Sequence, residues 1–397
     1  MFRISQFLRE IDQPTPAGPR RHPPGPVVIW NLLRRCNLTC KHCYSISADK
    51  HFPGELSTDE INTVMDDLRA FRVPVLILSG GEPLLHPDIY SIASRAKRLG
   101  FYVALSTNGT LIDRDNIDLI DAIAFDYVGI SLDGIAATHD RFRRQEGAFA
   151  ASLAALRLCR ERRIKVGVRY TMTEDNAHDL PALLRLVADE GIDKFYFSHL
   201  NYAGRGNKHR ADDARHTSTR AAMDLLFDTC LDSLRRGEDK EFVTGNNDAD
   251  GVYLLHWAAR RCPQSLPHLL AKLRQWGGNA SGVNVANIDN LGNVHPDTMW
   301  WHQTLGNVRE RPFSAIWSDP ANPLLERLRE HPRRLEGRCA GCRYLAICNG
   351  SSRVRAEQVT GNPWAEDPGC YLDDAEIGGG ASERIRTTPW TRLEKVA

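Results

Sequence analysis

The sequence predicts an α/β protein built around a partial barrel of six β/α units. Six short apolar runs recur between residues 26 and about 237, and amphipathic segments separate them. Each run is rich in Val, Ile, Leu and aromatic residues and is nearly continuous, as parallel strands buried on both faces are. Six strand-then-helix repeats indicate a (β/α)6 arrangement, an incomplete form of the eightfold TIM barrel.

The expected strands follow one another along the chain. In order, they are residues 26–33, 73–81, 101–109, 126–134, 164–172 and 193–200. The helix expected after the first strand has a clear start, because Ser57 followed by Glu60 three residues later is a capping-box pattern.

Polar residues and cysteines follow every expected strand. Because the chemistry of such barrels lies at the C-terminal ends of the strands, these segments should meet at one mouth. In chain order they are Cys36, Cys40 and Cys43; Ser79 to Pro83; Ser106 to Gly109; Ser131 to Gly134; Arg169 to Asn176; and His199 with the segment NYAGRG.

Composition narrows the class of protein. With 42% hydrophobic and 25% charged residues among 397, the chain reads as an ordinary globular protein. A formal net charge of +1 offers no electrostatic case for a nucleic-acid or membrane-surface partner. No apolar run has the length of a signal peptide or of a membrane span of about 20 residues. We therefore expect a cytoplasmic protein, and ten cysteines in such a chain indicate metal ligands rather than a disulfide framework.

The first cysteine group has the spacing C-x3-C-x2-C, from Cys36 through Cys40 to Cys43. A structural zinc site is closed by four ligands, whereas a 4Fe-4S cluster held by three thiolates leaves one iron without a protein ligand. An open iron implies a ligand from outside the protein.

The stretch CNLTCKHCY, followed by SGGEPLL, resembles the radical S-adenosylmethionine (SAM) superfamily. The resemblance implies that Cys36, Cys40 and Cys43 hold a 4Fe-4S cluster and are the catalytic cysteines. The amino and carboxylate groups of SAM would chelate the open iron. Electron transfer from the reduced cluster would then cleave SAM to methionine and a 5′-deoxyadenosyl radical, which abstracts hydrogen from the substrate.

Residues near this motif suit the binding of SAM. Glycines allow backbone groups to approach a ligand closely, and Glu82 could accept a charge-assisted hydrogen bond from the methionine ammonium. His42 and Tyr44 are expected to pack beside the cluster and the adenine. The expected SAM-binding residues are Gly80, Gly81, Glu82, Pro83, Ser106, Thr107, Asn108, Ser131, Asp133 and Arg169.

A second cysteine group, Cys339, Cys342, Cys348 and Cys370, has the spacing C-x2-C-x5-C-x21-C. Without context it fits a zinc ribbon about as well as an iron-sulfur site. The C-terminal extensions of SPASM and twitch radical SAM enzymes carry this pattern. The resemblance therefore implies a smaller α+β C-terminal domain in which the four thiolates hold an auxiliary 4Fe-4S cluster.

The chain departs from the full SPASM pattern, which has further cysteines before and after a Gly-containing hairpin. Asn279 and Asp297 stand at those places, so we expect one auxiliary cluster rather than two. Cys262 is an alternative ligand in place of Cys370. Cys159 and Cys230 lie in helical patterns and are expected in the core.

These features divide the chain into an N-terminal extension (1–25), a radical SAM core (26–240), an auxiliary-cluster domain (241–376) and a flexible tail (377–397). The likeness of stretches such as DADGVYLLHWAARRC and NASGVNVANIDNLGNVHPDTMWW extends over nearly all of residues 1 to 375. They resemble the radical SAM enzymes of heme d1 biosynthesis.

This resemblance implies an oxidoreductase or lyase that acts on a siroheme-derived tetrapyrrole. It would remove the C3 and C8 propionate side chains of 12,18-didecarboxysiroheme, with electrons from a reducing protein such as a flavodoxin or ferredoxin. Basic residues of the mouth would suit substrate carboxylates, and a Trp- and His-rich segment would suit a flat iron macrocycle. These residues are Arg141, Arg143, Arg144, Arg169, Arg205, Lys208 and His209, with His295, Trp300, Trp301 and His302.

Three other interpretations remain open. A SPASM-type maturase would modify a peptide, but residues 1–25 are short and Pro-rich for a peptide-recognition domain. Another heme or siroheme side-chain decarboxylase would fit the same motifs. A non-catalytic cluster or zinc protein is disfavoured by the intact C-x3-C-x2-C and GGEP motifs.

Overall fold

The computed structural model describes residues 1–15 and 25–378. Residues 16–24 of the predicted N-terminal extension, and the predicted tail from residue 379, lie outside the described residues. Within the described part, no helix is long and apolar enough to cross a membrane.

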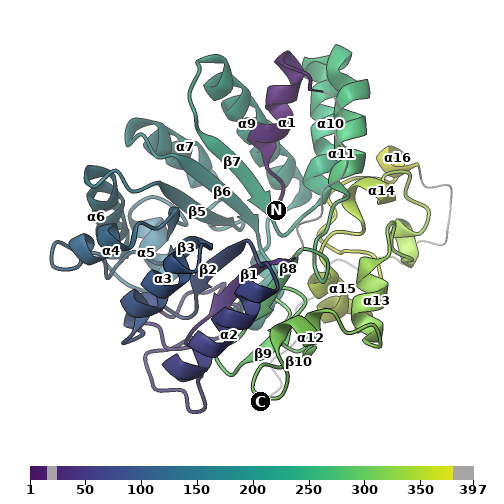
Figure 1. The fold of residues 1–397 in the computed structure, drawn as a ribbon. Coiled ribbons are helices and arrows are strands. Elements are labelled where there is room, and N and C mark those ends of the chain that lie inside the picture. Colours follow the sequence, from purple (N-terminus) through teal and green to yellow (C-terminus); the bar gives the residue numbers. More distant parts are fainter. Residues whose placement is uncertain (16–24, 379–397) are drawn as a thin grey trace, which may run out of the picture.

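One ten-stranded sheet organises the described residues, in the order β10-β9-β8-β1-β2-β3-β4-β5-β6-β7 (Figure 1). Strands β1 to β7 pair in parallel with their neighbours in chain order, β8 pairs in parallel with β1, and β8 to β10 are antiparallel. The strands are β1 (Val27–Asn31), β2 (Val75–Ser79), β3 (Tyr102–Thr107), β4 (Tyr127–Ser131), β5 (Val166–Met172), β6 (Lys194–His199), β7 (Glu241–Gly245), β8 (Val285–Ile288), β9 (Asn293–His295) and β10 (Gly306–Asn307).

Helices follow the parallel strands and lie around the sheet (Figure 1). The α-helices are α1 (Ile4–Asp12), α2 (Thr58–Ala70), α3 (Ile89–Arg98), α4 (Ile117–Ile123), α5 (Ala137–Arg143), α6 (Ala148–Glu161), α7 (Leu180–Asp189), α8 (Gly204–Lys208), α9 (His216–Arg235), α10 (Ala249–Arg261), α11 (Leu266–Trp276), α12 (Phe313–Trp317), α13 (Pro323–Arg329), α14 (Leu345–Cys348), α15 (Arg353–Thr360) and α16 (Asp374–Ile377). Short 3-10 turns are η1 (Pro83–Leu85), η2 (Ala177–Asp179), η3 (Arg210–Asp212), η4 (Pro263–Ser265) and η5 (Gly337–Cys339).

All six predicted strands are confirmed, and so is the capping box of α2. Ser57 N donates to Glu60 Oε2 (2.7 Å), and Glu60 N donates to Ser57 Oγ (3.3 Å). The sheet also continues past both ends of the predicted six-stranded core. β7 adds to β6, and β8, from the predicted auxiliary-cluster domain, adds to β1.

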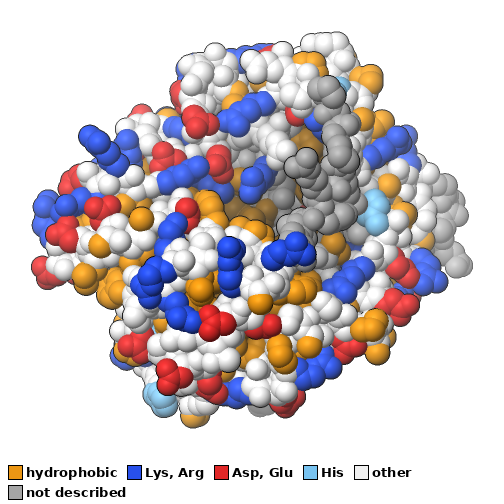
Figure 2. All heavy atoms as spheres, viewed as in Figure 1, with side chains coloured by type: hydrophobic (Ala, Val, Ile, Leu, Met, Phe, Trp, Pro, Cys, Tyr) orange, Lys and Arg blue, Asp and Glu red, His pale blue; other side chains and the backbone are white. Residues whose placement is uncertain are grey.

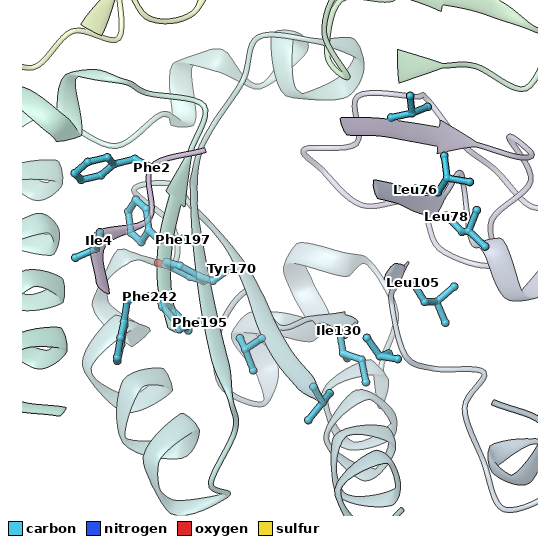
Figure 3. Close-up of a cluster of buried hydrophobic side chains, with 14 of the residues drawn as sticks. Phe2, Ile4, Leu76, Leu78, Leu105, Ile130, Tyr170, Phe195, Phe197 and Phe242 are labelled. Carbon is cyan, nitrogen blue, oxygen red and sulfur yellow. The ribbon is translucent and has the colours of Figure 1, made fainter. Parts of the chain in front are cut away.

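The main core lies between the sheet and its helices. Successive side chains of a strand point to opposite faces, and one face of each parallel strand is almost wholly apolar. Figure 3 shows part of this cluster, including Leu76, Leu78, Leu105, Ile130 and Phe195. Burial of these side chains stabilises the barrel by about 1.5–3 kcal/mol for each large apolar side chain.

The N-terminal residues belong to this core. Phe2 and Thr244 exchange two backbone hydrogen bonds (2.8 Å each), so the chain start pairs with β7. Phe2, Ile4 and Leu8 are buried, and α1 packs on α9 (Figures 1 and 3). The apolar stripe of α1 therefore covers the β7 side of the barrel.

On the opposite face of the sheet, β4, β5 and β6 carry large polar side chains. The Lys194 ammonium lies over the Tyr127 ring (4.9 Å), and the Arg169 guanidinium lies over the Tyr196 ring (5.2 Å). Glycines make room for them: a Cβ at Gly167 would lie 2.4 Å from Tyr127 Oη, and one at Gly245 would lie 1.9 Å from Tyr196 Oη. The barrel interior is therefore shaped by tyrosines that face glycines.

This packing can be tested at Gly245. We expect Gly245→Ala to lower the free energy of unfolding by about 1–3 kcal/mol, the usual cost of an overpacked site. Tyr196→Phe removes the clashing hydroxyl. In that variant, the same Gly245→Ala change should therefore lower the free energy of unfolding much less than it does in the parent protein. Urea denaturation followed by circular dichroism measures both. An equal loss with and without the tyrosine hydroxyl would exclude this clash as the cause.

Candidate functional site

The cysteine loop, defined here as residues 34–48, leaves the C-terminal end of β1. Cys36 and Cys40 are buried and Cys43 is half-buried. Burial, together with the negative charges of Cys40, Glu82 and Cys43, raises the pKa of Cys36 to about 12, although one backbone hydrogen bond from Leu38 lowers it. The three thiols are thus close enough for each negative charge to disfavour the others.

The GGEP turn after β2 packs directly on this loop. Gly81 N donates to Leu33 O (2.8 Å), and Glu82 N donates to Arg35 O (2.9 Å). A Cβ at Gly81 would lie 2.1 Å from Arg35 O, and one at Gly80 would lie 2.5 Å from Leu33 O. Gly81 therefore admits the backbone of the cysteine loop, and Gly80 admits the backbone of Leu33 just before it, contacts that the sequence pattern does not reveal.

Glu82 joins the exits of β2 and β3. Its carboxylate is fully buried and accepts from Thr107 Oγ1 (2.7 Å), Asn108 N (2.8 Å) and Leu84 N (3.2 Å). Burial raises the pKa of Glu82 to about 7, although these hydrogen bonds lower it. A carboxylate has about four lone-pair sites, so three donors leave capacity for one more.

Asn108 connects the β3 exit to the cysteine loop. Its Nδ2 donates to Asn37 Oδ1 (2.9 Å) and lies 4.0 Å from Cys36 Sγ. Ser106 accepts from Arg169 on β5, and Ser131 on β4 stands opposite Arg169 in the sheet register. The structure thus brings the predicted residues of β2 to β5 to one end of the barrel.

Asp133 has a different partner from the one expected. It is fully buried, forms an ion pair with Arg143, and accepts from Thr171 N (2.7 Å). Burial alone would raise the pKa of Asp133, but Arg143, His42, His139 and the hydrogen bond from Thr171 N together hold that pKa below its ordinary value. Arg143 Nη1 in turn lies 3.5 Å from Cys40 Sγ. The Asp133 carboxylate is therefore committed to Arg143, behind the cysteine loop.

The segment after β6 holds the cysteine loop from the other side. Arg205 Nε donates to Cys40 O (2.7 Å), Nη1 donates to Ser47 O (2.9 Å), and Arg205 N donates to Cys43 O (2.8 Å). A Cβ at Gly204 would lie 2.3 Å from Tyr44 O. Arg205 and Arg143, both expected to bind substrate carboxylates, instead contact the cysteine loop.

His42 and Tyr44, the two neighbours of the third cysteine, pack against other elements of the protein. The His42 ring stacks on Phe142 of α5 (4.6 Å between centroids). The Tyr44 hydroxyl accepts from Asn31 Nδ2 (2.7 Å), and its ring meets the edge of Trp301 (5.8 Å).

The structure brings the four C-terminal cysteines together. Burial raises the pKa of Cys348 well above its ordinary value, and charges at Cys339, Cys370 and Cys342 raise it further. In the described part of the chain, no group of three or more His, Cys, Asp or Glu side chains converges as one metal ion would require. Each thiolate of a 4Fe-4S cluster binds a different iron, so a cluster does not need such convergence.

The remaining cysteines lie elsewhere. Cys262 caps α10, where its backbone carbonyl accepts from Ser265 Oγ (2.8 Å), and its charged neighbours are Arg235 and Asp12. Cys159 and Cys230 are fully buried in the main core, as expected.

The side chains of Asn279 and Asp297, at the places of the missing SPASM cysteines, both form hydrogen bonds. Asn279 Nδ2 donates to Asp248 Oδ2 (3.0 Å), and Asn279 Oδ1 accepts from Arg333 Nη1 (2.8 Å). Asp297 Oδ2 accepts from Ser281 Oγ (2.5 Å). Between them, β8 and β9 form the expected hairpin.

The Trp- and His-rich segment divides into buried and accessible parts. Trp300 and His295 are fully buried; His295 Nδ1 contacts Gln303 O (3.0 Å) and Nε2 contacts Asp289 Oδ2 (3.2 Å). The His302 side chain is 42% exposed, and its Nε2 lies 2.5 Å from Glu357 Oε2. Only Trp301 and His302 of the four are therefore placed to meet a ligand.

Known proteins share these features. Residues 30–187 match the Radical SAM superfamily. The chain is 54% identical over 393 residues to the pre-heme d1 synthase of Dinoroseobacter shibae, covering 98% of this chain and 97% of that one. It is 43% identical over 356 residues to the Fe-coproporphyrin III synthase of Methanosarcina barkeri, covering 89% of each chain.

A solved structure shares the fold at low identity. SuiB of Streptococcus suis, bound to S-adenosylmethionine, superposes with a TM-score of 0.68 at 17% identity, covering 88% of this chain and 77% of that one. The fold, the three cysteines gathered in one loop and the relatives that match along nearly the whole chain all indicate the same family. The chain belongs to the radical SAM superfamily, and this membership implies a 4Fe-4S cluster and S-adenosylmethionine.

Proposed function

We propose that this protein is a radical SAM enzyme of heme d1 biosynthesis. It removes the C3 and C8 propionate side chains of 12,18-didecarboxysiroheme. The observation that carries the proposal is 54% identity to a pre-heme d1 synthase along nearly the whole of both chains. The second relative is named for an iron porphyrin, which supports an iron tetrapyrrole as the substrate class.

The residues of the cysteine loop fit a cluster bound by Cys36, Cys40 and Cys43. Three thiols lie close together, and two arginines face the loop, which suits the negative charge of a thiolate-bound cluster. When bound, the cluster supplies the electron that cleaves SAM to methionine and the radical that abstracts hydrogen from a propionate carbon.

Polar groups at the strand exits would hold SAM. Backbone groups at Gly80 and Gly81 stand next to the cysteine loop, and Glu82 has room for one further donor such as the methionine ammonium. Pro83 fixes the turn after them. The remaining proposed contacts, to the ribose or carboxylate, are Ser106, Thr107, Asn108, Ser131 and Arg169.

A second 4Fe-4S cluster, bound by Cys339, Cys342, Cys348 and Cys370, is proposed for the C-terminal region. Mutual charge effects among the four thiols, and the engagement of Asn279 and Asp297 in hydrogen bonds, support one auxiliary cluster with four protein ligands. Such a closed cluster would relay electrons from a reducing protein, for which a flavodoxin or ferredoxin is the natural class, rather than bind substrate.

The cluster assignment predicts iron content. Anaerobically reconstituted protein should hold about eight irons, and replacing Cys36, Cys40 and Cys43 by Ala should leave about four and abolish SAM cleavage. Replacing Cys339, Cys342 and Cys348 should also leave about four irons, whereas Cys262→Ala, the matched control, should keep eight. Eight irons in the second triple variant, or bound zinc, would contradict this map.

Turnover tests the substrate. Reconstituted protein with SAM, a strong reductant and didecarboxysiroheme should release 5′-deoxyadenosine and yield a macrocycle lighter by its propionate fragments, both measured by mass spectrometry. Deoxyadenosine formed without any change in the tetrapyrrole would refute the substrate assignment while leaving the radical SAM activity intact.

Recognition of the iron macrocycle is proposed to involve His302. Nε2 of its exposed imidazole lies against the Glu357 carboxylate, a pairing typical of metal-binding histidines, so Nδ1, which lies 3.4 Å from Gln358 Nε2, would be the atom that binds iron. We expect His302→Ala to weaken binding of iron coproporphyrin III roughly tenfold, about 1.4 kcal/mol, and to leave binding of metal-free coproporphyrin unchanged. Equilibrium titration of the holoenzyme measures both, with the exposed His178→Ala as control. An equal effect on both porphyrins would rule out ligation of the iron.

A further inference from the structure

Two consecutive residues at the end of helix α5, Phe142 and Arg143, make three contacts with the cysteine loop. Lys41 N donates to Phe142 O (3.1 Å), His42 stacks on the Phe142 ring (4.6 Å), and Arg143 Nη1 lies 3.5 Å from Cys40 Sγ. The first two contacts fix the end of the helix on the loop. The third places a permanent positive charge beside a thiol of the cysteine loop.

Arg143 is isolated from water and oriented from behind. Its side chain is only 9% exposed, and its Nη2 pairs with the fully buried Asp133. Asp133 is fixed in turn by Thr171 N (2.7 Å) on β5, and its own backbone N donates to His139 Nδ1 (2.9 Å) on α5. A charged pair in such surroundings is screened far less than one on the surface.

We propose that Arg143 is a positioning residue that sets the reduction potential of the SAM-binding cluster, with Asp133 limiting its effect. This inference rests on the proposed function of the cysteine loop. The potential of an iron-sulfur cluster depends on nearby charge and on hydrogen bonds to its sulfurs, and Arg143 supplies both at Cys40. A positive charge stabilises the reduced cluster, which carries one more negative charge than the oxidised one. The Asp133 carboxylate has the opposite effect.

A purely structural role for the pair would give a different result. If Arg143 only filled space and satisfied Asp133, its removal would lower stability or iron content without a directed change of potential. An electrostatic role requires the reduction potential of the cluster to shift in opposite directions when Arg143 and Asp133 are neutralised separately. Asn in place of Asp133 can still accept from Thr171 N, so this variant changes the charge with little change of shape.

The test is a redox titration of the reconstituted holoenzyme, followed by electron paramagnetic resonance. The signal that changes when SAM is added identifies the SAM-binding cluster and separates it from the auxiliary one. We expect Arg143→Met to shift its midpoint potential to more negative values and Asp133→Asn to shift it to more positive values. Arg143→Lys should give a smaller negative shift, because an ammonium keeps the charge but cannot contact both partners as a guanidinium does.

Arg157→Met is the matched control, since Arg157 is exposed and paired with Glu190 on the surface. Its potential should equal that of the unchanged protein. If Arg143→Met assembles no cluster, Arg143→Lys and Asp133→Asn still give the two signs. Equal potentials in these variants and the parent, or shifts of the same sign, would overturn the inference. The lack of any SAM-responsive signal in the parent protein would instead overturn the proposed function.

Discussion

The candidate site depends on the close approach of three backbones. The cysteine loop is contacted on one side by Gly81, after β2, and on the other by Gly204, at the start of α8. At both places an added Cβ would lie 2.1–2.3 Å from a carbonyl oxygen of the loop. The positions of the thiols are therefore set by the exits of two other strands, because the loop has no regular secondary structure of its own that could set them.

The same arrangement brings positively charged side chains to the cysteine loop. A loop that binds a cluster through thiolates accumulates negative charge in a buried place, and burial alone disfavours charged thiols. Arg143 reaches Cys40 from α5, and Arg205 binds the loop carbonyls from the segment after β6. On the face shown in Figure 2, Lys and Arg side chains lie among Asp and Glu side chains. The two arginines that contact the cysteine loop differ from such surface residues, because Arg143 is buried and Arg205 is half-buried.

Local features of the sequence were sufficient for much of the fold. The strands β1 to β6 and the capping box at Ser57 could be predicted because their signals lie within a few residues of one another. β7 has only two apolar residues, Phe242 and Val243, and β8 reads as half of a hairpin, so neither signals that it joins the barrel. Their membership depends on partners more than 40 residues away in the chain.

The residues expected to bind the cluster and SAM were recognisable from the sequence, whereas the residues that support them were not. Cysteine spacing and the GGEP turn are local patterns. The partnership of Asp133 with Arg143 and Cys40 arises only when β4, α5 and the cysteine loop meet, so Asp133 was expected at SAM and Arg143 at the substrate. Likewise, His295 is buried and His302 is exposed, although only six residues separate them and the local sequence does not reveal which is accessible.

The pairing of β8 with β1 bears on how the two predicted domains relate. The division expected at residue 240 falls just before β7, and β8 lies beyond it, so both outer partners of the six predicted strands come from the second segment. A chain lacking that segment would present unpaired N–H and C=O groups along β1 and along β6. Unprotected strand edges of this kind recruit other strands. The segment after residue 240 therefore covers both edges of the six predicted strands, a structural role that does not depend on any cluster it binds.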